Sequence, residues 1–219
     1  MKERYFTPDN IAEVSAGMIG GLMRSKGGKD TVFSPACSAL LILDMQRYFL
    51  DENSHAYIPS MEAIIPGIAR LAAAFSAAGR PLIMTRHLNT EENAGMMGRW
   101  WKDLIRKEDE MSGIVDSLSF AGATGMEKTQ YDAFYSTDLE EMLCDEGVSQ
   151  LVVTGVMAHL CVESTARSAF VRGFEVFLPA DSIATYNIQL HMGSLRGLSH
   201  GFAVPVTSDM ITGAFEDGR

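Results

Sequence analysis

Basic residues are scarce in this chain of 219 residues, which has 18 Lys and Arg against 28 Asp and Glu and a formal net charge of −10. Such a composition argues against a nucleic-acid-binding surface, which needs a basic field to displace phosphate counterions. Long apolar runs are also missing, since the longest candidate, residues 16–23, is far shorter than a bilayer span and contains three glycines. Glu3, Asp9 and Glu13 argue against a signal peptide. We therefore expect a soluble, cytoplasmic protein with no nucleic-acid and no membrane partner.

Cysteine is rare as well, with Cys37, Cys144 and Cys161 far apart in the sequence. A disulfide framework or a zinc ribbon would need closer or more numerous thiols. The five histidines have no close His-x-His or His-x-x-x-His spacing. The sequence thus predicts no metal and no cofactor.

Strand and helix patterns alternate from residue 38 onward, beginning with a continuous apolar run over 39–43 that is typical of a strand buried on both faces. Five further strands are expected, over 82–85, 125–129, 151–153, 174–178 and 203–206. Helices are expected over 66–78, 137–147, 161–172 and 188–200. This order predicts an α/β fold with a doubly wound, mostly parallel six-stranded sheet and helices on both faces. Pro205 assigns the last strand to an edge.

Two segments fall outside this alternation. Residues 1–35 form a predicted helical extension, with a helix from Asp9 to about residue 24 and a loop over 25–30, while residues 36–219 form the domain. The extension packs either on its own domain or on a neighbouring subunit. A connection of about 40 residues, 86–125, contains Trp100 and Trp101, and connections of that length in a compact domain are often functional.

Three polar side chains stand where chemistry is expected in such a sheet, at the carboxyl ends of strands. Asp44 directly follows the first strand, Lys128 lies in a predicted strand, and Cys161 opens a helix after the strand over 151–153. A thiol at a helix N-terminus sees the positive end of the dipole, which favours the thiolate. The plainer alternatives are a turn-capping Asp, a solvated Lys and a buried structural Cys, as we infer for Cys37 and Cys144.

The chain resembles the isochorismatase-like hydrolase superfamily. The resemblance covers most of residues 38–207 and rests on 40–46 with Phe49, Lys128 with 133–134 and 137–139, 153–162 with 165–166, 173–176 and 180–181. It implies a Rossmann-like fold and a catalytic Asp–Lys–Cys triad made of Asp44, Lys128 and Cys161. It also implies a cis peptide between Val156 and Met157, whose turn would supply the backbone N–H groups of an oxyanion site.

Two features depart from the family pattern. The nicotinamidase branch of the family carries an Asp/His/His metal cluster that has no counterpart in this sequence, and Ser168 stands where the family commonly has Asp. We expect the second change to alter a contact behind the triad. The predicted pocket walls are aromatic residues near the triad motifs or in the long connection, namely Phe49, Trp100, Trp101, Tyr131 and His159. Arg86, His87 and Arg99 are either receptors for an anionic substrate or solvated loop charges.

Three functions remain open at this point. The first is hydrolysis of a C–N bond in a small amide or carbamoyl compound through a Cys161 thioester. The second is isochorismatase-type cleavage of a vinyl ether to pyruvate, in which Asp44 acts as the acid and no thiol attack is needed. The third is a non-catalytic binding protein that retains the fold. The resemblance also implies a homodimer or homotetramer, with a small molecule as substrate.

Overall fold

A single sheet of seven strands organises the chain, whose computed structural model describes residues 1–22, 30–120 and 122–217. The strand order is β3-β2-β1-β4-β5-β7, with β6 beside β4, and all six pairings are parallel. The strands are β1 (Ser38–Leu43), β2 (Leu82–His87), β3 (Thr124–Lys128), β4 (Gln150–Val156), β5 (Glu175–Pro179), β6 (Ile183–Ala184) and β7 (Ala203–Val206). The doubly wound fold is confirmed. The two-residue β6 is the addition to the six predicted strands.

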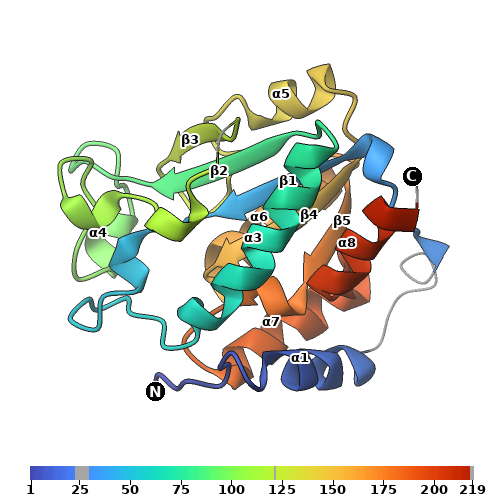
Figure 1. Ribbon diagram of the computed structural model, residues 1–219. Coiled ribbons are helices and arrows are strands. Elements are labelled where there is room, and N and C mark those ends of the chain that lie inside the picture. Colours follow the sequence, from blue (N-terminus) through green and yellow to red (C-terminus); the bar gives the residue numbers. More distant parts are fainter. Residues whose placement is uncertain (23–29, 121, 218–219) are drawn as a thin grey trace.

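Helices cover both faces of the sheet, with α3 and α8 in contact on the front face of Figure 1 and α6 and α7 in contact behind it. The helices are α1 (Ile11–Gly20), α3 (Met61–Ala77), α4 (Met97–Trp100), α5 (Leu139–Asp145), α6 (Glu163–Val171), α7 (Ile188–Gly201) and α8 (Ser208–Asp217). None of the helices in the described ranges combines the length and hydropathy that a bilayer crossing requires.

The structure differs from the predicted helices at α3, which starts earlier than predicted, and at α8, which was not predicted. The helix predicted to start at Pro66 begins five residues earlier, so that Pro66 lies inside α3, where it removes one backbone hydrogen bond. The terminal helix α8 was not predicted, because its N-terminus is stabilised from a distant segment. The Asp181 carboxylate accepts hydrogen bonds from the backbone N–H and the hydroxyl of Ser208.

The sheet changes its winding direction between β1 and β4, which are paired from Ser38–Gln150 to Leu43–Gly155. In doubly wound sheets ligands bind at this point, beyond the carboxyl ends of the strands. Gly155 is required here, since its φ is +101° and a Cβ would come within 2.1 Å of the Leu43 carbonyl oxygen. β1 and β4 therefore pack closely enough to bring the segments that follow them together.

The N-terminal segment packs on its own chain, along the lower edge of the molecule in Figure 1. Tyr5 and Phe6 are buried, and both of their backbone N–H groups donate to the hydroxyl of Ser60. Met18 of α1 is buried as well. The boundary near residue 35 between extension and domain stays a prediction, and the predicted loop over 25–30 lies outside the described residues except for Asp30.

Candidate active site

Asp44, Lys128 and Cys161 meet beyond the carboxyl ends of three strands. Asp44 follows β1, Lys128 is the last residue of β3, and Cys161 lies in a π-helical turn, Ala158–Val162, between β4 and α6. The Lys128 Nζ is 2.8 Å from Asp44 Oδ2 and 3.4 Å from Cys161 Sγ. The side chains of Asp44 and Lys128 are fully buried, and Cys161 is 7% exposed. The structure thus brings together three residues that are up to 117 positions apart in the sequence.

Further hydrogen bonds fix Asp44 and Lys128 in this group. The Thr85 hydroxyl donates to Asp44 Oδ1 at 2.6 Å, and the Asp44 backbone N–H points back to Thr85. Lys128 also donates to the carbonyl oxygens of Gln130 and Tyr131, at 2.8 and 3.4 Å. Asp44 itself has a φ of 51°, a left-handed conformation that is uncommon for a residue other than glycine. Such conformations cluster at functional sites, where the surrounding structure holds them in place.

Asp44 and Lys128 form a charged pair. Burial alone would raise the pKa of the Asp44 carboxyl, but Lys128, His87 and a hydrogen bond from the Cys161 thiol outweigh it and lower that pKa. Burial likewise opposes the charge of Lys128, yet Asp44 and Cys161 raise its pKa above the ordinary value. Burial and Lys128 lower the pKa of His87 to about 4, so its ring is neutral at pH 7.

The pKa of the Cys161 thiol is raised, whereas its place near a helix N-terminus on its own favours the thiolate. Burial raises the pKa of the thiol to about 12. The Lys128 ammonium acts to lower this pKa, whereas the negative charge of Asp44 acts in the same direction as burial. A neutral thiol beside an ionised carboxylate is a nucleophile paired with its base.

The turn before Cys161 has the expected cis peptide between Val156 and Met157. The backbone N–H groups of Leu160 and Val162 both donate to the Met157 carbonyl oxygen, which closes the turn. Cys161 therefore projects from a fixed turn directly after β4.

Asp44, His87 and Cys161 are the one group of potential metal ligands found among the described residues, with one ligand atom of each within 4.8 Å of the others. The same space already holds the Lys128 ammonium, 2.8 Å from Asp44 and 3.4 Å from both Cys161 Sγ and His87 Nδ1. A metal ion there would lie against a buried positive charge. The donor set does not fit a metal while Lys128 is present.

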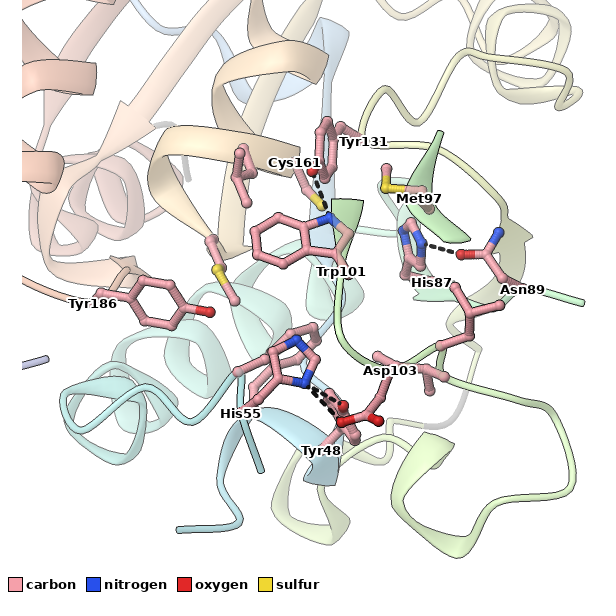
Figure 2. Close-up of a pocket in the computed structure, with 16 residues that line it drawn as sticks. Tyr48, His55, His87, Asn89, Met97, Trp101, Asp103, Tyr131, Cys161 and Tyr186 are labelled. Atoms are coloured by element: carbon pink, nitrogen blue, oxygen red, sulfur yellow. Dashed lines mark hydrogen bonds and ion pairs between the residues drawn. The ribbon is translucent and has the colours of Figure 1, made fainter. Parts of the chain in front are cut away.

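A pocket opens onto Cys161, and Figure 2 shows the residues that line it. Of the predicted walls, Phe49, Trp101 and Tyr131 line this pocket. Trp100 and His159 do not: Trp100 is 74% exposed to solvent, and His159 lies in the π-helical turn without reaching the lining. His87, considered as an anion receptor, and Met157 of the cis peptide also line the pocket. The sequence analysis did not identify the remaining lining residues, namely Tyr48, His55, Ala56, Asn89, Met97, Asp103, Leu104, Ile105, Leu160 and Tyr186. These residues come from five separate segments, and no local signal marks them.

Aromatic and aliphatic side chains dominate the pocket, and the lining includes one carboxylate, that of Asp103. The Trp101 Nε1 donates to the Tyr131 hydroxyl at 2.8 Å, and the His55 ring contacts both Asp103, at 3.2 Å, and the Tyr48 hydroxyl. No Lys or Arg side chain is among the described lining residues.

The two arginines considered as anion receptors lie elsewhere. Arg86 pairs with Glu127 at 2.7 Å, and Arg99 lines a separate surface depression with Glu91 and Lys102. The solvated-charge alternative therefore describes them better.

Ser168 contacts a residue of the loop behind the triad and not the triad itself, as expected. Its hydroxyl donates to Asp132 Oδ2 at 2.7 Å, so Asp132 supplies the carboxylate that position 168 lacks. The other Asp132 oxygen accepts from the Phe134 backbone N–H. This carboxylate holds the loop whose Gln130 and Tyr131 carbonyl groups receive Lys128.

Comparisons with known proteins agree with this architecture. The isochorismatase domain model matches residues 38–210. Nicotinamidase 3 of Arabidopsis thaliana is 36% identical over 180 residues, covering 80% of this chain and 86% of its own. Enterobactin synthase component B of Escherichia coli K12 is 34% identical over 173 residues, covering 76% of this chain but only 59% of its own. A cysteine hydrolase from Pseudomonas syringae pv. phaseolicola shares the fold, with a TM-score of 0.78 at 21% identity over 85% of this chain and 96% of its own. The protein is a hydrolase and belongs to the isochorismatase family.

Proposed function

We propose that this hydrolase cleaves the C–N bond of a small, uncharged amide or carbamoyl compound through a thioester on Cys161. The observation that carries the proposal is the position of the buried Cys161 sulfur beside the buried Asp44–Lys128 pair. The raised pKa of the thiol and the lowered pKa of Asp44 support a neutral thiol next to a carboxylate. A carboxylate poised to accept the proton of a thiol is what nucleophilic attack on a carbonyl requires.

In the proposed reaction Asp44 accepts the thiol proton as Cys161 Sγ bonds to the carbonyl carbon. The backbone N–H groups of Met157 and Cys161 stabilise the developing oxyanion. The proton then passes from Asp44 to the leaving nitrogen, the C–N bond breaks, and ammonia or an amine departs. Water, activated by Asp44, attacks the thioester, releases the carboxylic acid and returns the proton to the sulfur. Lys128 stays protonated and holds Asp44 throughout.

The pocket supports an uncharged substrate. Its lining carries the Asp103 carboxylate and aromatic rings, with neither Lys nor Arg among the described lining residues, so an anionic substituent would find no partner. The relative named Nicotinamidase 3 supports an amide as the substrate class.

Vinyl-ether cleavage fits this site less well for two reasons. It needs a proton on Asp44, yet Lys128 helps to lower the pKa of that carboxyl and keeps it ionised. Isochorismate is also a dicarboxylate, and the pocket lining offers it the Asp103 carboxylate but no Lys or Arg among the described lining residues. Burying the Asp44–Lys128 pair costs desolvation free energy, and a non-catalytic role would give no functional reason for that cost.

A matched set of substrates tests this proposal. We expect the wild-type protein to release ammonia from benzamide with a kcat/KM at least about tenfold above that for the monoamide of isophthalic acid, because a pocket carboxylate repels the added one. Ammonia and pyruvate release are measured in parallel, with isochorismate as the vinyl-ether substrate. Pyruvate from isochorismate without ammonia from any amide would overturn the proposal, as would no release at all from the folded protein.

A further inference from the structure

The segment that precedes α1 reaches two walls of the pocket. Lys2 Nζ donates to the backbone carbonyl of His55 at 2.7 Å and lies 4.9 Å from the centre of the Tyr186 ring. Both His55 and Tyr186 line the pocket, and Figure 2 shows their side chains on the side away from His87 and Asn89. A single ammonium group thus joins two wall segments that are 131 residues apart in the sequence.

The neighbouring residues hold the Tyr186 segment at three more points. The Glu3 backbone N–H donates to the Tyr186 carbonyl at 2.8 Å, and the Glu3 carboxylate accepts from the Ile188 backbone N–H at 2.7 Å. The Tyr5 hydroxyl accepts from the Thr185 backbone N–H at 2.9 Å. Residues on both sides of Tyr186 are therefore fixed by this segment.

Tyr5 also links this segment to the turn that carries Cys161. Its hydroxyl lies 2.9 Å from His191 Nδ1, and burial lowers the pKa of His191 to about 3, so the neutral ring can accept a hydrogen bond from the hydroxyl. Thr185, held by Tyr5 through its backbone, contacts His159 Nδ1 through its hydroxyl. His159 lies two residues before Cys161 in the π-helical turn.

We propose that Lys2 and Tyr5 are positioning residues that fix the His55 and Tyr186 walls and so set the width of the pocket for a flat substituent. All of these contacts come from residues that precede the region matched by the family model, which starts at residue 38. The kinetic part of this inference rests on the proposed amide hydrolysis. The pocket geometry can be tested without it.

A covalent probe of pocket width provides that test. Cys161 is alkylated with iodoacetamide and, separately, with N-phenyl iodoacetamide, and peptide mass spectrometry measures the modification at this residue alone. The ratio of the two rates reports how well the pocket accepts a ring next to the thiol. The variants are Lys2→Met, Lys2→Arg and Tyr5→Phe, with Glu13→Gln on the exposed side of α1 as control.

We expect Lys2→Met and Tyr5→Phe to lower the phenyl-to-unsubstituted rate ratio about threefold or more, because each removes hydrogen bonds that hold a wall. The KM for benzamide rises by a similar factor while kcat changes less, since the triad is untouched. Lys2→Arg, which keeps the donor and the charge, retains the wild-type values, as does Glu13→Gln. Lys2 is exposed, so its variants report on the wall even where Tyr5→Phe alters folding.

An unchanged alkylation ratio in Lys2→Met would overturn the inference, whatever the enzyme hydrolyses. A lowered ratio in a protein that cleaves no amide would support the wall assignment and contradict the proposed function instead. A fall in kcat alone, with the ratio and KM unchanged, would also contradict a positioning role at the wall.

Discussion

Replacing Cys161 by alanine is expected to lower kcat for amide hydrolysis by roughly 10⁴-fold or more, because no other group can form the thioester. Alanine removes a sulfur that lies 3.4 Å from Lys128 Nζ and beside Asp44. The measurement is ammonia release from benzamide under saturating substrate.

Cys144→Ala is the matched control, since this residue lies in α5, away from the pocket lining. Its thiol is exposed, so the buried position inferred for it from the sequence was wrong. The kcat of this variant should equal that of the wild type. Amide hydrolysis that survives in Cys161→Ala, with unfolding curves of both variants intact, would rule out the thioester. Pyruvate release that survives would instead point to acid catalysis at Asp44.

Replacing Asp44 by asparagine is expected to separate reactivity of the thiol from catalysis. Hydrolysis falls by about 10³-fold, since the base that takes the thiol proton is gone. The thiolate, however, becomes easier to form. Burial and the Asp44 carboxylate both hold the pKa of Cys161 at about 12 in the wild type, and the substitution removes the carboxylate while Lys128 remains.

The direction of the expected change in the pKa of Cys161 follows from the charges around the sulfur. An anion beside a thiol raises its pKa and a cation lowers it, so losing Asp44 lowers the pKa and increases the thiolate fraction at pH 9 by at least about tenfold. Thiolate absorbance is recorded against pH in a Cys37→Ser/Cys144→Ser background, where Cys161 is the only thiol.

Asp138→Asn, at an exposed position before α5, is the control and should leave the titration unchanged. A titration of Cys161 that moves to higher pH in Asp44→Asn would contradict the electrostatic description of the site. Retained hydrolysis in the same variant would remove Asp44 as the base.

Much of the fold could be predicted because burial leaves a local trace in the sequence. The short apolar runs of β1 and of β7, which contains Pro205, indicate these strands in the sequence, since a strand buried on both faces is apolar throughout. Polar residues directly after such runs, as at Asp44, mark the edge of the sheet where ligands bind.

The rest depends on contacts between distant segments. Nothing near Cys161 in the sequence reveals that Asp44 raises the pKa of its thiol, because that effect needs the two strands side by side. Trp100 and Trp101 are adjacent and chemically identical, and only the packing against Tyr131 separates the pocket residue from the exposed one. The contacts of Lys2 with the His55 carbonyl and the Tyr186 ring lie outside the residues on which the family resemblance rests.

The proposed thioester can be observed directly. Wild-type protein is mixed with benzamide, quenched in acid within the first turnover, digested and analysed by mass spectrometry. We predict a benzoyl adduct on the peptide that contains Cys161 and no adduct on the peptides of Cys37 or Cys144. Ammonia release without any adduct on Cys161, at a time when turnover is under way and acylation outpaces deacylation, would contradict covalent catalysis by this residue.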